Sequence, residues 1–360
     1  ININIESQTK FVDIENNLLR YDISSLQENK DSANIFFIIL DGMMTLDSAE
    51  KLKIIENKKA IINSLKKDNI NYKENFLVNY DSTYLSIASL LEGSYPATEE
   101  TRRYRTRKNF FPIFLLNQKK DNNFFKILRK TNKKFFWLGN SNASCQNNIY
   151  INCISDNKNL KFISIASLFY FDSIYIYLFN KIPYQTDNRY EAVNFLINPK
   201  KEFKKNEIYL LHVLNPHPPY YLNKKCEIKN DLIANLKNKE MEIEYYSYAY
   251  NCLVNMAQTF ANKISKINEN NLVFIMGDHG WSFDYEIMKK NNLSENRFKT
   301  FFSYKIPSKC NQISTPNSIV NVIRFALTCN GNMDIKYLKD LQFKSFYEGH
   351  KNYGRVFLKN

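Results

Sequence analysis

The chain has 360 residues, of which 44% are hydrophobic, 15% aromatic and 24% charged. This composition excludes global disorder and supplies enough apolar side chains for one large α/β domain. The formal net charge of +14 favours anionic partners such as phospholipid headgroups or acidic glycans, whereas nucleic acid is not expected because no nucleic-acid-binding motif is present.

Apolar runs alternate with helical patterns along the chain, which predicts an α/β fold with a mostly parallel central sheet and helices on both faces. Nearly continuous apolar runs, typical of strands covered on both faces, occupy 34–40, 135–138, 208–214 and 272–276, and 298–306 is a further strand candidate. Apolar residues at helical spacing occupy 51–66 and 245–267. We expect a catalytic domain at 34–330, an N-terminal extension at 1–33, and a C-terminal tail at 331–360 packed on the same domain.

Neither an initiator Met nor a signal peptide is present, so the chain is expected to be a mature or excised ectodomain. The segment 162–179 comes nearest to a membrane span, but Asp172 lies inside it, and a charge at mid-bilayer is costly. We therefore expect an amphipathic or core helix there, with docking onto a membrane surface as the more specific alternative.

Three of the apolar runs end in residues that can bind a cation. The first leads into Asp41-Gly42, the run at 208–214 leads into Pro216-His217, and the run at 272–276 leads into Asp278-His279-Gly280. Because ligands of open α/β sheets bind beyond the carboxyl ends of the strands, we expect these side chains at one edge of the sheet. Carboxylate and imidazole together suit Zn²⁺ best, and also Mn²⁺. Helix capping by Asp41 and a simple turn at 278–280 are the alternatives.

Two histidines lie five residues apart in the segment 212–217. Prolines on both sides of His217 fix its backbone, which favours a functional role such as binding an anionic oxygen or a second metal. His212 falls inside the expected strand, where a structural core imidazole and a site residue are equally good interpretations. His350 lies in a polar tail and is expected on the surface.

The nucleophile of such a site is expected to be a Ser, Thr or Cys near the metal. The segment 79–96 is typical of a turn entering a helix that ends near Gly93, with Asp81, Ser82 and Thr83 at the helix start. There the free N–H groups favour an anion such as a phosphoryl group. An ordinary helix cap is the alternative for Thr83.

The order of these motifs resembles the alkaline phosphatase and sulfatase superfamily, over roughly residues 34 to 330. Sulfatases have a Cys or Ser nucleophile followed by x-Pro-Ser-Arg and a Ser-Leu-Leu-Thr-Gly segment. Aligning Ser89-Leu-Leu-Glu-Gly93 with that segment places Thr83 at the nucleophile, although only Ser86 matches the x-Pro-Ser-Arg part. A Thr cannot become formylglycine, which argues against a true sulfatase.

A Thr nucleophile is instead similar to the phosphoethanolamine transferases and lipoteichoic acid synthases. His212 and His217 resemble the paired histidines of phosphoethanolamine transferases, in which the second histidine, here His217, contacts the substrate phosphate. The resemblance therefore implies that His212 and His217 both bind substrate. A further His of those enzymes has no match here, so a full second metal site is not implied. The metal ligands implied by the resemblance are Asp41, Thr83, Asp278 and His279.

The reaction implied is transfer of phosphoethanolamine or phosphoglycerol from an anionic or zwitterionic phospholipid to a cell-surface glycan, through a phospho-Thr83 intermediate. Arg297 is expected to hold the acceptor or the headgroup. A hydrolase of the same fold, either a phosphodiesterase or a sulfatase, is one rival. A catalytically inactive glycan- or lipid-binding module, which predicts no bound metal, is another. The resemblance also implies a periplasmic or extracellular enzyme at the membrane surface, anchored through a segment absent from this chain.

Six cysteines are present, and an even number fits disulfides in an oxidising compartment, with buried free thiols as the alternative. The C-terminal half further resembles sulfatase-like proteins encoded among bacterial surface-polysaccharide genes, over stretches that begin at His217-Pro-Pro-Tyr and end near Cys329. That resemblance implies the pairs Cys226–Cys252 and Cys310–Cys329, and it leaves Cys145–Cys153 as a local pair.

Overall fold

A computed structural model of the chain describes residues 26–29, 32–99, 111, 123–139, 151–153, 190–199, 202–233, 238–281, 283, 285–291, 293, 296–331, 336–346 and 355–359. These residues form two compact units. The sheet unit comprises the described residues of Lys30–Asn75 and Lys133–Asn311. The helical unit comprises those of 1–29, 76–132 and 312–360. The expected boundaries at residues 33 and 330 concern the extent of the catalytic domain and stay a prediction.

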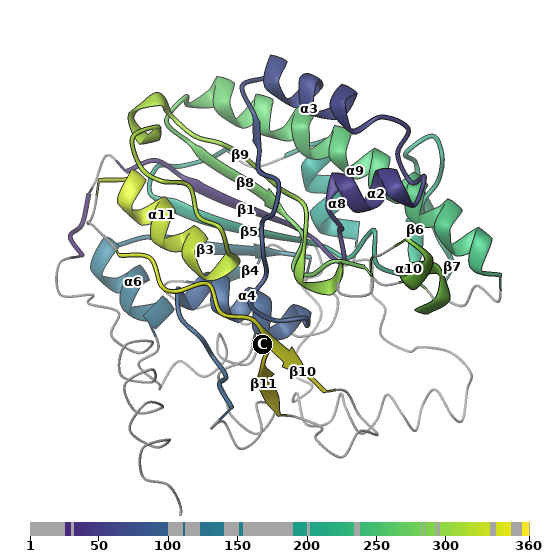
Figure 1. The fold of residues 1–360 in the computed structure, drawn as a ribbon. Coiled ribbons are helices and arrows are strands. Elements are labelled where there is room, and N and C mark those ends of the chain that lie inside the picture. Colours follow the sequence, from purple (N-terminus) through teal and green to yellow (C-terminus); the bar gives the residue numbers. More distant parts are fainter. Residues whose placement is uncertain are drawn as a thin grey trace, which may run out of the picture. The chain divides into compact units, whose positions relative to one another are not determined.

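The sheet unit contains a seven-stranded sheet with the order β2-β9-β8-β1-β5-β3-β4 (Figure 1). Five neighbouring strands, from β8 to β4, are parallel, and β9 is antiparallel to both of its neighbours. Every apolar run named above forms one of these strands, which confirms the predicted α/β fold. The strands are β1 (Ile35–Leu40), β2 (Asn71–Tyr72), β3 (Lys134–Leu138), β4 (Ile151–Cys153), β5 (Glu207–Val213), β8 (Leu272–Met276) and β9 (Phe302–Lys305).

One face of this sheet packs against helices of the same unit. Alternate residues of β1, namely Phe36, Ile38 and Leu40, belong to a buried core that also contains the apolar stripe of α9. Helix α9 (Lys239–Ile267) begins six residues before the predicted start. The side chain of Asn238 caps this earlier start, and the first turns are polar, so apolar periodicity did not indicate them. The remaining helical segments are α2 (Leu46–Lys51), α3 (Lys58–Lys67), α8 (Glu191–Ile197), α10 (Tyr285–Lys290), η3 (Asn296–Phe298) and η4 (Ser308–Cys310).

The helical unit is organised around α4 (Thr83–Glu92), which packs against α6 (Asn123–Thr131), η5 (Ile319–Asn321) and α11 (Val322–Cys329). The helix ends at Gly93, whose φ of 58° and left-handed conformation are typical of a helix C-terminus, so the predicted end is confirmed. The buried Arg324 of α11 donates from Nε to the Gly93 carbonyl at 2.7 Å. Two short strands, β10 (Phe343–Ser345) and β11 (Val356–Leu358), form an antiparallel pair.

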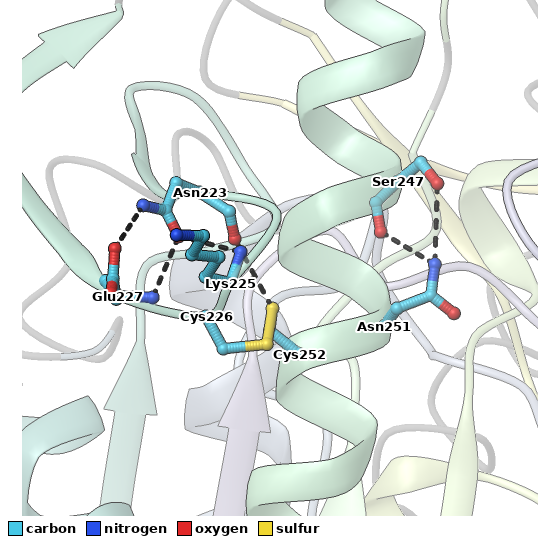
Figure 2. Close-up of a disulfide and its surroundings, with 7 residues drawn as sticks. All are labelled: Asn223, Lys225, Cys226, Glu227, Ser247, Asn251 and Cys252. Atoms are coloured by element: carbon cyan, nitrogen blue, oxygen red, sulfur yellow. Dashed lines mark hydrogen bonds between the residues drawn. A yellow bond between two sulfur atoms is a disulfide. The ribbon is translucent and has the colours of Figure 1, made fainter.

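A disulfide joins Cys226 to Cys252, as predicted, and thereby ties the turn between β6 (Tyr220–Leu222) and β7 (Ile228–Ile233) to α9 (Figure 2). The Asn223 carboxamide organises that turn by accepting from the backbone N–H groups of Lys225 and Glu227 at 2.9 and 3.0 Å. Cys310 and Cys329 are each disulfide-bonded, and no described cysteine is free. The buried-thiol alternative is therefore wrong for these residues.

Within the part of the chain that the structure describes, no helix has both the length and the apolar character needed to cross a membrane. Three earlier expectations fall outside that part: the character of the segment 162–179, the Cys145–Cys153 pair and the surface position of His350. They stay predictions.

Candidate metal centre

The strand ends of the sheet unit meet as the sequence predicted. Parallel pairing aligns Leu40 of β1 with Val213 of β5, and Ile39 of β1 with Met276 of β8. Asp41, the first residue after β1, donates its backbone N–H to the Val213 carbonyl at 2.9 Å. The residues that follow β1, β5 and β8 therefore lie together at one edge of the sheet.

The turn after β8 is held in place by hydrogen bonds and by close backbone packing. Asp278 Oδ1 accepts from the backbone N–H groups of Gly42 at 2.9 Å and of His279 at 3.0 Å. The Gly280 N–H donates to the Arg297 carbonyl at 2.9 Å. A Cβ at Gly280 would lie 2.1 Å from the Asn296 carbonyl oxygen, so only glycine allows this approach.

Two carboxylate oxygens and one ring nitrogen face each other at the centre of the site. His279 Nε2 lies 3.6 Å from Asp41 Oδ1 and 3.7 Å from Asp278 Oδ2. His279 Nδ1 lies 3.1 Å from the Gly280 carbonyl oxygen and must donate to it, which in the neutral ring leaves a lone pair on Nε2. Both carboxylate oxygens are buried and have no hydrogen-bond partner among the described residues.

This donor set fits a divalent cation. Two carboxylate oxygens and one ring nitrogen converge, and a buried carboxylate oxygen without a hydrogen-bond partner costs free energy that a bound cation would recover. Two carboxylates and an imidazole are ligands that suit Zn²⁺ or Mn²⁺. Asp41, Asp278 and His279 thus lie together, and their role as metal ligands stays a prediction.

His212 lies against Asp41. Its Nε2 is 3.2 Å from Asp41 Oδ2, the carboxylate oxygen that does not face His279, and the residue is 8% exposed. Candidate ligand atoms of Asp41, His212 and Asp278 all lie within 4.8 Å of one another. His212 thus orients the Asp41 carboxylate. Its predicted contact with substrate stays a prediction.

The electrostatics of the site favour a charged Asp41 carboxylate and a neutral His279 imidazole. Burial raises the pKa of Asp41, but three surrounding imidazoles outweigh burial and bring this pKa to about 2. Burial lowers the pKa of His279, and the charge of Arg297 adds to burial against the raising effect of the two carboxylates. Burial also opposes the charged form of His212, but its hydrogen bond to Asp41 raises the pKa overall. An ionised Asp and a neutral His are the forms that bind a metal.

His217 lies beside this cluster and is held by hydrogen bonds to Asp41 and to Pro218. Its backbone N–H donates to the Asp41 carbonyl at 2.9 Å, and its Nδ1 donates to the Pro218 carbonyl at 2.5 Å. The His217 ring is 6.3 Å from the His279 ring, measured between centroids. Because Nδ1 is engaged, Nε2 is the nitrogen with which His217 can bind a substrate oxygen.

Arg297 lies in η3, half-buried, and its charge is close enough to lower the pKa of His279. Thr83 is the first residue of α4, with Ser82 as the N-cap residue, so the capping alternative for Thr83 is wrong. Thr83 belongs to the helical unit, and its part in the metal site stays a prediction.

Two further residues border the site: Gly42, which the sequence analysis noted after Asp41, and Trp281, which it missed. Gly42 has a φ of 71°, and a Cβ there would lie 3.2 Å from the Trp281 ring and 3.6 Å from both His217 and His279. Trp281 follows the Asp-His-Gly turn directly, and its ring centroid is 4.8 Å from that of His217. The only available signal for Trp281 was its position one residue after the turn.

Comparisons with known proteins show the family to which this chain belongs. The chain belongs to the sulfatase family, whose model matches residues 33–331. The resemblance to the alkaline phosphatase and sulfatase superfamily noted in the sequence is thereby confirmed. A comparison with curated proteins finds no match.

Among solved structures, the C-terminal periplasmic domain of EcEptC from Escherichia coli matches with a TM-score of 0.52 at 12% identity, covering 92% of this chain and 93% of that chain. A protein of the alkaline phosphatase superfamily from Vibrio parahaemolyticus matches with a TM-score of 0.50 at 9% identity, covering 96% and 82%. The lipoteichoic acid synthase LtaP from Listeria monocytogenes gives a TM-score of 0.47 at 16% identity, covering 90% and 80%. At these identities the likeness to the first two structures concerns the fold.

Proposed function

We propose that this protein is a metal-dependent transferase of the sulfatase family that moves a phospho-headgroup from a phospholipid to a surface glycan. The observation that carries the proposal is the cluster of Asp41 Oδ1, Asp278 Oδ2 and His279 Nε2, two oxygens of which are buried without a hydrogen-bond partner among the described residues. When bound there, a divalent cation such as Zn²⁺ would supply Lewis-acid stabilisation of an oxyanion.

Thr83 is the proposed nucleophile. It occupies the first position of α4, where the positive end of the helix dipole favours the oxygens of a phosphoryl group. In the proposed reaction the Thr83 oxygen forms a bond to phosphorus as the bond to diacylglycerol breaks. The oxygen of an acceptor hydroxyl then bonds to phosphorus as the phosphorus–Thr83 bond breaks; the Thr83 proton has left with diacylglycerol, and the acceptor proton restores the Thr83 hydroxyl. The choice of a transferase over a true sulfatase is supported by the residue type, because Thr cannot be converted to formylglycine.

The substrate phosphate is proposed to meet His217 and Arg297. His217 presents Nε2 beside the carboxylate cluster, and Arg297 supplies a positive charge near His279. Both suit the equatorial oxygens of a phosphoryl group, on which negative charge accumulates. A net charge of +14 suits an enzyme that works on anionic lipid, which we place at the outer face of a cell envelope.

Two variants test the nucleophile. Thr83→Val keeps the shape of the side chain without the hydroxyl and should abolish donor cleavage, whereas Thr83→Ser keeps a hydroxyl and should retain measurable turnover. With phosphatidylethanolamine or phosphatidylglycerol in detergent as donor, mass spectrometry should find a phosphorylated peptide containing Thr83 in the unmutated protein. Equal turnover in Thr83→Val would remove Thr83 from the mechanism. Headgroup release to water alone, with every acceptor offered, would identify a phosphodiesterase instead.

A further inference from the structure

The antiparallel pair of β10 and β11, called here the C-terminal strand pair, has two faces of different chemistry (Figure 1). Side chains alternate between the two faces of a strand, so residues that pair across the strands share a face. The inner face holds Phe343 and Val356, which are 3% and 1% exposed and belong to a buried cluster of the helical unit. The outer face takes no part in the mechanism proposed above.

The outer face combines cations with aromatic rings. Lys344 pairs with Phe357 across the strands, and the same alternation places Phe346 and Arg355 beside them. The rings of Phe346 and Phe357 meet edge-on at 5.4 Å between centroids, and Lys344 Nζ lies 5.9 Å from the centre of the Phe346 ring. Lys344 and Arg355 are exposed, and both rings are half-buried. Positive charge and apolar rings therefore reach solvent on one surface.

The charge of the outer face is positive. Backbone pairing continues beyond the strands, because the Lys359 N–H donates to the Gln342 carbonyl at 2.7 Å. The described residues that alternate onto this face are Gln342, Lys344, Phe346, Arg355, Phe357 and Lys359, and none of them is acidic. One carboxylate lies at the edge of β11, where Glu99 accepts from the Leu358 N–H at 2.8 Å. A surface of this charge attracts anions.

The inner face is hydrogen-bonded to the segment that precedes Thr83. The Phe343 N–H donates to the Asn79 carbonyl at 2.8 Å. The Asp81 carboxylate, which is 5% exposed, accepts from the backbone N–H of Ser345 at 2.8 Å and from its hydroxyl at 2.5 Å. Strand β10 is therefore fixed to the chain two residues before the proposed nucleophile, and its outer face looks away from that contact.

The combination of cations and rings distinguishes between anionic partners. Cations alone would suit any polyanion, including an acidic glycan. Phenylalanine rings gain free energy where they leave water, as they do at the boundary between lipid headgroups and acyl chains. Attachment to an anionic membrane surface draws on both the buried apolar area and the attraction of Lys and Arg. The outer face therefore fits anionic phospholipid better than a polysaccharide.

We propose that the outer face of the C-terminal strand pair docks on a membrane surface rich in anionic phospholipid and so brings donor lipid to Thr83. In the docked state Lys344 and Arg355 contact lipid phosphates, and the rings of Phe346 and Phe357 enter the headgroup region. The delivery of donor depends on the proposed function, whereas the docking does not.

Sedimentation with sucrose-loaded vesicles tests the docking. Vesicles of equal parts phosphatidylglycerol and phosphatidylcholine should bind the unmutated protein more tightly than vesicles of phosphatidylcholine alone, and added salt should weaken the binding. Lys344→Gln and Arg355→Gln should each weaken it about fivefold, since a cation near an anionic surface contributes ~1 kcal/mol. The double variant should weaken it about 25-fold if the two effects add.

Lys309→Gln is the matched control. It removes the same charge from an exposed residue of η4 in the sheet unit, and it should bind vesicles as the unmutated protein does. Equal binding by the double variant and the unmutated protein, or no preference of the unmutated protein for anionic vesicles, would overturn the docking surface. Retention on immobilised heparin that the double variant loses, without vesicle binding, would show that the face binds an acidic glycan instead.

The delivery of donor is tested with phosphatidylglycerol in two forms, one in vesicles and one with short acyl chains as a monomer in solution. At limiting vesicle concentration, the double variant should lower the ratio of vesicle cleavage to monomer cleavage about 25-fold, in line with its weaker docking. Lys309→Gln should leave this ratio unchanged. An unchanged ratio in the double variant would refute the delivery role. If the unmutated protein cleaves neither form, the proposed function fails while sedimentation still decides the docking surface.

Discussion

The carboxylate pair of the proposed metal centre makes a prediction about stability that needs no substrate. Asp41 and Asp278 each bury one oxygen that has no hydrogen-bond partner among the described residues. A cation that binds only the folded state stabilises it by RT ln(1 + [L]/Kd), which is about 2.7 kcal/mol at a hundredfold excess over Kd. For a unit of this size, each kcal/mol corresponds to about 2–4 °C, so zinc should raise the melting temperature of chelator-treated protein by roughly 5–10 °C.

Asp278→Asn gives the matching perturbation. It removes one charged ligand and one buried negative charge, so the metal-free variant should melt no lower than the metal-free unmutated protein. If zinc affinity falls a thousandfold, the same zinc concentration contributes less than ~0.1 kcal/mol. Differential scanning fluorimetry after chelation, with and without Zn²⁺ or Mn²⁺, measures both effects. Asp47→Asn, a change at an exposed carboxylate paired with Lys58, is the control and should respond like the unmutated protein. A zinc shift in Asp278→Asn equal to that of the unmutated protein would refute the assigned site.

Three further predictions concern stability. Replacing Cys226 and Cys252 with Ser opens a link that spans 26 residues and should lower the unfolding free energy by about 3.5 kcal/mol on the chain-entropy estimate, measured by urea denaturation. Burial raises the pKa of Glu92 from 4.5 to about 7. The contribution of Glu92 to stability is therefore fully present below pH 4.5 and is lost as the pH rises through 7. The loss is roughly 3 kcal/mol, because the pKa shift of about 2.5 units corresponds to about 1.36 kcal/mol per unit. Glu92→Gln should therefore flatten the pH dependence of stability between pH 5 and 8, and an unchanged slope would contradict this assignment. Gly42→Ala should cost at least 1–2 kcal/mol, because its φ is 71° and the new Cβ would meet Trp281 at 3.2 Å; thermal melting at wild-type stability would contradict the strain.

Much of this site was predictable from the sequence because the signal is local. An apolar run followed by Asp41 or by Asp278-His279 gives both the strand and the residue at its carboxyl end, and parallel pairing then brings the ends together. The early start of α9 was not predictable from apolar periodicity, because the Asn238 cap and the polar turns after it carry no such pattern.

The role of His212 shows a different limit. Alternation along β5 tells which face a side chain lies on, but not which atom it will meet there, and only the folded chain shows its Nε2 at Asp41 Oδ2. The contact between Trp281 and His217 could not be predicted either, because it joins a residue after β8 to a residue after β5 through side-chain packing alone.

The backbone contact at Gly280 bears on which ions the protein can select. Because the carbonyl oxygens of Asn296 and Lys299 lie directly against that glycine, the loop carrying two of the three proposed ligands cannot move outward without disturbing η3. A rigid site of this kind disfavours Ca²⁺, because Ca²⁺ requires six to eight oxygen ligands at 2.3–2.6 Å in a flexible arrangement. We expect Ca²⁺ to compete poorly here even where it is far more abundant than zinc or manganese.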